Sequence, residues 1–180
     1  MKVTPTRLPE VLLIEPRVFA DSRGLFFESW SQREFGRAGI DAHFVQDNHS
    51  RSAQGVLRGL HYQIRQPQGK LVRVVAGEIF DVAVDIRRSS ANFGRWEGIR
   101  LSADSHNMLW VPVGFAHGFC VLSEHAEVLY KTTDFYSPGD ERCLLWNDPT
   151  LRIDWPLPAA PMLSPKDAVG VLLRDAETFP

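Results

Sequence analysis

The sequence has few cysteines, and nothing in it depends on them. Only Cys120 and Cys143 occur among the 180 residues, and their spacing is not that of a CxxC motif for a metal or a redox disulfide. Cys120 lies in the apolar run 119–122, where a free thiol is usually buried as a small hydrophobic side chain. Disulfides are also unnecessary, because a chain of this length can bury roughly 70% of its unfolded surface.

An excess of charge and long hydrophobic runs are missing as well. The net charge is −2, so no overall positive field would attract nucleic acid, and any phosphate must be bound by local arginines. No apolar stretch approaches the roughly 20 residues of a membrane span. The first ten residues contain two prolines and lack the apolar core of a signal peptide. These absences indicate a cytoplasmic protein with neither a nucleic-acid nor a membrane partner.

Helical patterns are scarce, whereas short strand patterns are frequent. Residues 71–87 alternate apolar and polar side chains around Ala76–Glu78, which predicts a β-hairpin. Capping signals predict short helices after Ser31 and after Ser164. Further short apolar or aromatic runs, at roughly regular spacing, are typical of a β-sandwich or barrel. They lie at 11–14, 24–28, 56–63, 98–101, 108–111, 118–122 and 127–133.

The chain shows no sign of a division into domains. It contains no internal repeat, low-complexity tract or change of composition, so residues 1–180 are expected to form a single domain. Four prolines between 149 and 161 indicate an extended connector. We therefore expect residues 147–180 to be a C-terminal connector with a short helical segment that packs on the barrel.

Polar side chains interrupt two of the apolar strand patterns. Arg58 and His61 lie in the run 55–63, and Lys70 begins the next run, so strand alternation can turn them toward a cavity. An arginine binds phosphate, an imidazole transfers protons near neutral pH, and an ammonium group stabilises a developing oxyanion. Taken one by one, the same residues are more often a structural histidine and two surface charges.

A second histidine lies in a familiar pattern. The run from Pro112 through Gly114 to His117 resembles the second motif of the cupin superfamily, whose members are small double-stranded β-barrels. The stretch corresponding to the first motif contains His61 alone, without the second histidine and the glutamate of an iron site. We therefore expect no metal and no other cofactor.

Seven ordered segments carry the most specific pattern: 21–28 (DSRGLFFE), 44–50 (FVQDNHS), 55–63 (GVLRGLHYQ), 69–73 (GKLVR), 114–119 (GFAHGF), 129–134 (LYKTTD) and 163–167 (LSPKD). Together they resemble the dTDP-4-dehydrorhamnose 3,5-epimerase family, and the match covers nearly the whole chain. The resemblance implies an all-β fold: a double-stranded β-helix, or jelly-roll (cupin) barrel, with a few short peripheral helices.

The resemblance implies catalytic roles for four residues. His61 corresponds to the general base, Asp167 to the acid that orients its imidazole, Tyr130 to the general acid and Lys70 to the group that stabilises an enolate. The set is chemically coherent, because a neutral histidine is a competent base at pH 7 and a carboxylate on its other nitrogen fixes the tautomer. Alternatives stay open: Asp167 also suits the N-terminus of a helix, and Tyr130 also suits a strand position with a hydrogen-bonded hydroxyl.

The implied substrate is dTDP-4-dehydro-6-deoxy-D-glucose. Its C4 ketone acidifies the hydrogens on C3 and C5, so removing either one gives an enolate, and protonation from the opposite face inverts the carbon. The implied product is dTDP-4-dehydro-L-rhamnose, an intermediate of dTDP-rhamnose biosynthesis, formed without a redox cofactor or metal. Three alternatives remain: an epimerase of C3 or C5 alone, a metal-dependent cupin oxygenase and a non-catalytic binding module for sugar nucleotides.

The remaining matched positions resemble the family's contacts to nucleotide and sugar. They are Arg23, Glu28, Gln46, Asp47, Asn48, Arg58, Lys70, His117, Glu141 and Lys166. Arginine and lysine suit a diphosphate, whereas glutamine and asparagine offer the paired donor and acceptor that could bind a thymine edge. The family also implies a homodimer formed by strand exchange. If the segment 23–28 reaches the partner's site, Arg23 and Glu28 act there.

Overall fold

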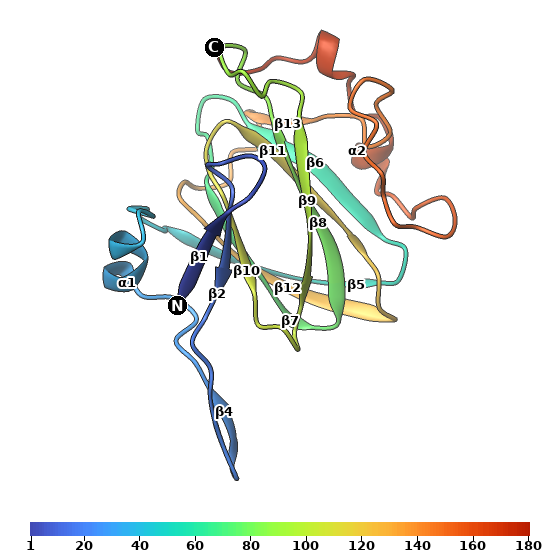
Figure 1. Cartoon of the computed structure of the whole chain (residues 1–180). Coiled ribbons are helices and arrows are strands. Elements are labelled where there is room, and N and C mark those ends of the chain that lie inside the picture. The colour runs from blue at the N-terminus through green and yellow to red at the C-terminus, as the bar shows by residue number, and fades with distance from the viewer.

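Two antiparallel β-sheets face each other in the computed structural model, which describes residues 1–180 (Figure 1). The six-stranded sheet has the order β1 (Lys2–Pro5), β2 (Leu12–Glu15), β10 (Met108–Val111), β7 (Lys70–Ala76), β12 (His125–Thr132) and β5 (Gln46–Ala53). The five-stranded sheet has the order β13 (Glu141–Cys143), β6 (Leu57–Gln63), β11 (Phe115–Val121), β8 (Glu78–Asp85) and β9 (Trp96–Ser102). The expected all-β cupin architecture is confirmed.

Helices are few and short, and both capped starts are where the sequence predicts them. Helix α1 (Gln32–Arg37) begins after Ser31, whose hydroxyl accepts a hydrogen bond from the Glu34 main-chain N–H. Helix α2 (Pro165–Ala168) begins after Ser164 in the same way. One 3₁₀ turn, η1 (Leu173–Asp175), lies near the C-terminus. None of these helices has the length and apolar character needed to cross a membrane.

The hairpin predicted for residues 71–87 is wrong. Both strands exist, but β7 pairs with β10 and β12, whereas β8 pairs with β11 and β9 in the other sheet. The chain changes sheets at Gly77, where φ is +74° and a side chain would collide with His125 and Ser123. Alternating hydrophobicity indicates that a strand has one buried face, but it does not say which strand lies beside it.

The barrel interior is apolar in one part and polar in another. Along β7, the inward positions Val74 and Val72 belong to the main hydrophobic core, while Lys70 lines a cavity. Along β12, Val128 belongs to the same core and Tyr130 lines the cavity. The largest buried cluster, of 14 residues, thus fills one section of the space between the sheets, and polar side chains line the remaining section.

The C-terminal segment packs on the barrel. Leu151, Leu173 and Ala176 are buried in one cluster with residues of β6, β8 and β11. Short bridges at Met162 and Val171 fix the same segment to Val56 and Leu144. This packing brings helix α2 next to β6.

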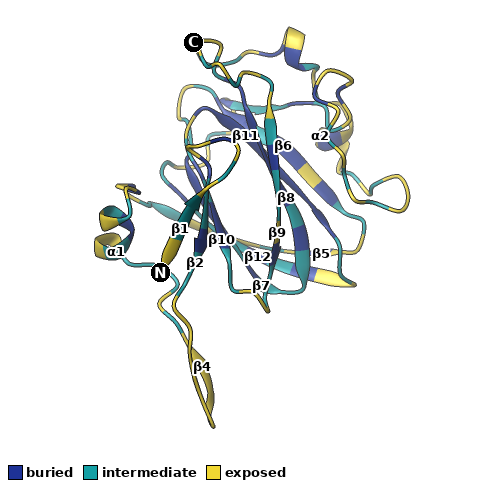
Figure 2. Cartoon of the chain, viewed as in Figure 1, coloured by how far each residue is buried: buried dark blue, intermediate teal, exposed yellow.

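A two-stranded arm projects away from both sheets (Figure 1). It consists of β3 (Phe19–Asp21) and β4 (Gly24–Phe26), and every residue in these strands is exposed (Figure 2). Phe26 is 70% exposed and Leu25 53%. The arm therefore presents apolar side chains that this chain alone does not cover.

Strands β6 and β11 approach each other closely through two glycines. A Cβ atom on Gly59 would lie 2.6 Å from the Cα atom of Gly118, and one on Gly118 would lie 2.6 Å from the main-chain oxygen of Arg58. Two residues beyond Gly59, His61 pairs in register with His117. The close approach therefore fixes the strand that carries the candidate base.

We predict that Gly118→Ala destabilises the fold by about 1–3 kcal/mol, because the added methyl group has no space between the strands. Urea unfolding of the two proteins measures the difference. The control is Gly36→Ala in helix α1, where the new methyl group meets nothing within 4 Å and alanine is the better helix former. An equal change in the free energy of unfolding for the two substitutions would contradict the close approach of β6 and β11 at Gly118.

Candidate active site

A cavity of about 360 Å³ occupies the polar section of the barrel. Its lining comes from both sheets, with β5, β7 and β12 on one side and β6, β11 and β13 on the other, and helix α2 at its edge. Nine of the residues predicted from the sequence line it: Gln46, Asn48, Arg58, His61, Lys70, His117, Tyr130, Glu141 and Lys166.

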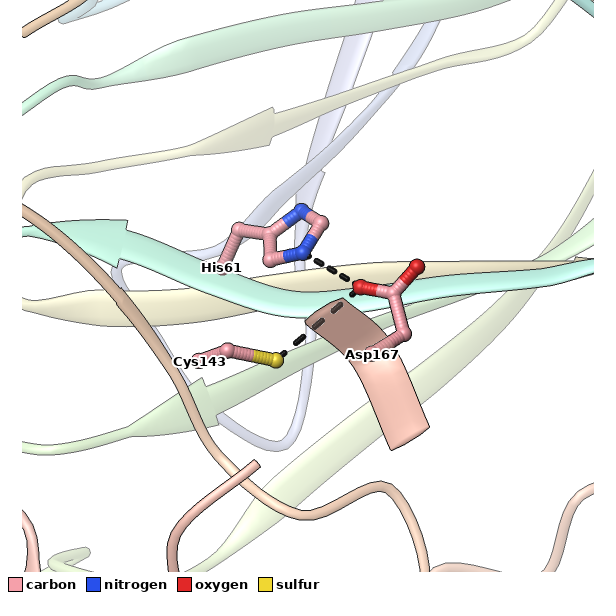
Figure 3. A group of neighbouring side chains, drawn as sticks. All are labelled: His61, Cys143 and Asp167. Atoms are coloured by element: carbon pink, nitrogen blue, oxygen red, sulfur yellow. Dashed lines mark hydrogen bonds and ion pairs between the residues drawn. The ribbon is translucent and has the colours of Figure 1, made fainter. Parts of the chain in front are cut away.

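A short hydrogen bond joins His61 to Asp167. The His61 Nε2 atom lies 2.6 Å from Asp167 Oδ1, while the other ring nitrogen is turned away from this carboxylate (Figure 3). Ser164 Oγ donates to Asp167 Oδ2 at 2.7 Å and accepts from the Asp167 main-chain N–H at 3.2 Å. Asp167 therefore lies in the first turn of α2 and also holds the imidazole of His61. The helix-terminus position and the contact with His61, which the sequence offered as alternatives, occur together.

Asp167 is ionised throughout the neutral range. Burial raises its pKa, but hydrogen bonds from His61 and Ser164 outweigh burial and lower the pKa to about 2. The carboxylate can therefore stabilise the positive charge that forms when the free nitrogen of His61 takes up a proton.

Lys70 places a buried ammonium group beside the dyad. Its Nζ atom donates to the main-chain oxygen of His61 at 3.2 Å, and the residue is only 8% exposed. Burial lowers the pKa of Lys70 to about 8, although the negative charges of Asp81 and Glu141 oppose this effect. At neutral pH the group is still charged and is suited to a developing oxyanion in the cavity.

Tyr130 lies on the opposite sheet from His61. It comes from β12 in the six-stranded sheet, whereas His61 comes from β6 in the five-stranded sheet. Burial raises the pKa of the Tyr130 phenol, with the charge of Arg58 acting against this change. Its hydroxyl has no hydrogen bond to another protein group. A tyrosine with a purely structural role on this strand would be expected to have a hydrogen-bonded hydroxyl. The phenol is thus protonated at neutral pH and free to donate.

Strand β5 divides its polar side chains between two faces. Gln46, Asn48 and Ser50 alternate along the strand and line the cavity, and Gln46 Nε2 donates to Asn48 Oδ1 at 2.9 Å. Asp47 points to the other face, where its carboxylate accepts from Lys131 Nζ at 2.9 Å. The structure therefore does not bring Asp47 into this cavity.

Arg23 and Glu28 are also outside the cavity that their own chain forms. Arg23 lies in the turn of the exposed arm, where its NH2 atom donates to Asp21 Oδ2 at 2.6 Å. Glu28 follows the arm and is exposed. An active site built from one chain therefore lacks both residues.

Charged and polar groups at the cavity rim are paired. Lys166 Nζ donates to Glu141 Oε1 at 2.6 Å, and the Tyr136 hydroxyl donates to Glu141 Oε2 at 2.9 Å. Arg58 Nε donates to Ser52 Oγ at 3.0 Å. The rim thus offers cations from both β6 and α2 to an anionic ligand.

The dyad also has a cysteine close to it. Ligand atoms of His61, Cys143 and Asp167 lie within 4.8 Å of one another (Figure 3). Burial and the charge of Asp167 raise the pKa of Cys143 to about 12, which disfavours the thiolate that a metal requires. The direct hydrogen bond between the other two residues accounts for their arrangement, and we assign no metal here.

Comparison with known proteins agrees with this geometry. Residues 5–175 match the dTDP-4-dehydrorhamnose 3,5-epimerase family. The chain belongs to this family. It is 64% identical over 181 residues to the dTDP-4-dehydrorhamnose 3,5-epimerase of Pseudomonas aeruginosa, with 100% of both chains covered. The activity predicted from the sequence is confirmed: the chain is an isomerase, a 3,5-epimerase of dTDP-rhamnose biosynthesis.

Two solved structures of the family are similar over nearly the whole fold. The dTDP-6-deoxy-D-glucose-3,5-epimerase of Legionella pneumophila, in complex with dTDP-4-keto-L-rhamnose, is 51% identical with a TM-score of 0.95, covering 98% of this chain and 94% of that one. The dTDP-4-dehydrorhamnose 3,5-epimerase of Bacillus anthracis, with TDP and PPi bound, is 46% identical with a TM-score of 0.92, covering 95% of this chain and 98% of that one.

Several cavity residues of this epimerase were not predicted from its sequence. Ser50 lines the cavity, and its buried hydroxyl has no hydrogen-bond partner. The alternation that turns Gln46 and Asn48 inward could have identified it. Gln68 and Tyr136 reach the cavity from connecting segments, for which the sequence carries no comparable periodic signal.

We predict that Lys70→Met stabilises the epimerase by about 1–3 kcal/mol at pH 7 while reducing turnover at least about 100-fold. The folded-state pKa of about 8 lies below the ordinary 10.5, so the unfolded chain binds more protons between these values. Wild-type stability therefore rises with pH across this window, and the advantage of the variant disappears above it.

Urea unfolding at pH 7 and pH 10.5, together with turnover at pH 7, checks this prediction. The control is Lys2→Met, because the side chain of Lys2 is 72% exposed and its charge does not have to be buried. A Lys70→Met protein less stable than wild type at pH 7 would contradict the expected penalty for burying the charge.

Proposed function

We propose that this enzyme inverts C3 and C5 of dTDP-4-dehydro-6-deoxy-D-glucose through two enolate intermediates. The observation that carries the proposal is the position of the His61–Asp167 dyad and Tyr130 on opposite sheets of one cavity, with Lys70 beside the dyad. Such an arrangement places a base on one side of a bound sugar and an acid on the other, which inversion requires.

The cavity suits the two ends of a sugar nucleotide. Arg58 and Lys166 supply positive charge for a diphosphate, and Gln46 and Asn48 supply amide donors and acceptors for a thymine edge. The bound dTDP-4-keto-L-rhamnose in the Legionella enzyme and the bound TDP in the Bacillus enzyme support a dTDP-sugar as the ligand here too.

In the proposed reaction, His61 removes the proton. Asp167 holds Nε2, so the other ring nitrogen accepts the hydrogen from C3 or C5, and the ionised carboxylate stabilises the imidazolium. In the chair form of a D-gluco ring, the hydrogens on C3 and C5 are both axial and lie on the same face. One base can therefore reach both carbons with a small shift of the sugar.

The negative charge of each enolate develops on the C4 oxygen, where Lys70 is the proposed partner. Its ammonium group is already in place and dehydrated, so little reorganisation is needed when the charge forms. Tyr130 then donates its phenolic proton to the opposite face of the carbon, and the centre is inverted. The alternative, inversion of only one carbon, uses the same groups with a differently positioned sugar.

We predict that proton NMR of dTDP-4-dehydro-6-deoxy-D-glucose with the enzyme in deuterated water shows loss of both the C3 and the C5 signals. Each carbon loses its proton to His61, and the enolate is reprotonated from groups that exchange with solvent. Loss of one signal alone would favour the single-centre alternative.

The substitution His61→Ala is expected to abolish both exchanges while changing dTDP affinity by less than about threefold, since the base acts in proton transfer more than in ground-state binding. His49→Ala is the matched control, because His49 lies on the outer face of β5 beside Glu127 and should leave exchange unchanged. Normal turnover by the His61→Ala protein would exclude His61 as the base.

We predict that Tyr130→Phe, unlike His61→Ala, impairs inversion more than proton removal. Proton removal by His61 remains possible, so the substrate still exchanges hydrogen with solvent, but less of it is inverted because the acid on the opposite face is missing. NMR measures exchange and product configuration in the same sample. Full inversion at the wild-type rate would rule out Tyr130 as the acid.

We also propose that the enzyme is a homodimer in which the β3–β4 arm extends over the partner, so that Arg23 and Glu28 act in the partner's cavity. The support is the exposure of Phe19, Leu25 and Phe26 on a two-stranded arm, because such a hairpin is marginal in water on its own. The absence of both polar residues from their own chain's cavity supports the same arrangement.

Mixing two inactive variants tests this assembly. Arg23→Ala leaves the cavity of its own chain intact, and His61→Ala leaves the arm intact. A mixed dimer therefore contains one complete site, and co-refolding equal amounts should restore about a quarter of wild-type activity. Activity equal to the average of the two separate variants would contradict action across the dimer.

A further inference from the structure

A second histidine–aspartate pair lies beside the first and has no part in the proton transfers proposed above. His117 on β11 is the register partner of His61 on β6. Its Nε2 atom lies 2.9 Å from Asp81 Oδ1 and 3.0 Å from Asp81 Oδ2. The side chain of Asp81 is completely buried, while His117 lines the cavity. The cavity therefore has two neighbouring imidazoles, each held by a carboxylate.

The two carboxylates differ in their other partners. Asp167 accepts hydrogen bonds from a serine hydroxyl and a main-chain N–H besides its histidine. Asp81 has no hydrogen-bond donor other than His117. The nearby cation, Lys70, directs its hydrogen bond to the main-chain oxygen of His61 instead. A buried carboxylate with a single donor depends on that donor, so the hydrogen bond to His117 is the one that Asp81 must keep.

The second nitrogen of His117 has no partner in the protein. Asp81 holds Nε2, and no other protein group forms a hydrogen bond with the ring. Because His117 is in register with His61 and both residues line the cavity, the two imidazoles lie side by side on the same face of the sheet.

We propose that Asp81 is a positioning residue that fixes the ring of His117, so that this imidazole can make a hydrogen bond to an oxygen of the sugar ring. The proposal rests on the proposed function, because it takes the sugar to lie against His61. The two pairs then have different roles: His61 receives protons, whereas His117 holds the sugar in register with the base.

Other charged groups around His117 come from every element packed against it. Strand β6 contributes His61 and Arg58, β8 contributes Asp81 and β7 contributes Lys70, while Glu141 and Lys166 lie at the rim. Glu141 and Lys166 form an ion pair of 2.6 Å with each other. Asp81 is thus the one carboxylate bonded directly to this ring.

Nitrogen-15 NMR of the intact enzyme tests the hydrogen bond directly. Nε2 of His117 should show the one-bond proton coupling of a nitrogen that donates to Asp81, and Asp81→Asn should change its shift. A His117 Nε2 without an attached proton, or one that Asp81→Asn leaves unchanged, overturns the proposal. Thermal unfolding and dTDP binding show whether the variant is folded.

Kinetics separate a positioning role from a structural one. Asp81→Asn should lower kcat/KM about tenfold or more and leave dTDP affinity within about threefold of wild type. In a His117→Gln background the same substitution should have almost no further effect, because its only route is through the ring. An equal loss of kcat/KM in both backgrounds overturns the proposal. A loss of dTDP affinity as large as the loss of kcat/KM also overturns it, because it would place His117 on the diphosphate.

Hydrogen–deuterium exchange by the wild-type enzyme distinguishes failure of the proposed function from failure of the role proposed for Asp81. Absence of exchange at C3 and C5 would refute the proposed function whatever the state of His117. Normal exchange in the wild-type enzyme, together with a wild-type kcat/KM in Asp81→Asn, would refute only the role of Asp81.

Discussion

The hydrogen bond between His61 and Asp167 joins two parts of the chain that are 106 residues apart. One partner belongs to a central strand of the five-stranded sheet, and the other to a four-residue helix in the C-terminal segment. A helix this short has little stability of its own, so the Ser164 cap and the packing of Leu151, Leu173 and Ala176 must hold it against the barrel. The orientation of the base therefore depends on how a peripheral segment covers the outer face of the sheet.

The barrel contains an apolar core and a polar cavity, which occupy different sections along the same strands. Val72 and Val74 contribute to a core that stabilises the fold, and two residues before Val72 the same strand places a buried ammonium group that opposes stability. The cavity keeps that charge because a dehydrated donor stabilises an oxyanion more strongly than a hydrated one. Stability from one section of the interior thus offsets the strain of function in the other.

Sequence alone predicted most of the strands, the two capped helix starts and most of the cavity. Short apolar runs and the capping serines Ser31 and Ser164 indicated the strands and helices, whereas most of the cavity residues followed from the family resemblance. The hairpin at residues 71–87 failed because pairing partners are set by tertiary contacts, and β7 and β8 belong to different sheets. Asp47 failed to reach the cavity for a related reason: a family motif names adjacent residues, whereas a strand sends neighbours to opposite faces. Asp81 lies within an apolar strand and carried no signal until the fold set it against His117.

The strand order also has consequences for how the molecule is made. Strand β2 pairs with β10, whose residues follow almost a hundred positions later, so the N-terminal strand pair has no neighbour in its sheet during most of synthesis. Only β1–β2, β3–β4 and β8–β9 pair with their neighbours in sequence, and the other strand pairs join more distant parts of the chain. Folds dominated by distant contacts form slowly. Helix α2, which supplies Asp167, follows every strand of the two sheets in the sequence. A nascent chain on the ribosome therefore contains all of its strands before it contains the carboxylate that holds the base, and catalysis begins only after the C-terminal segment has emerged and docked.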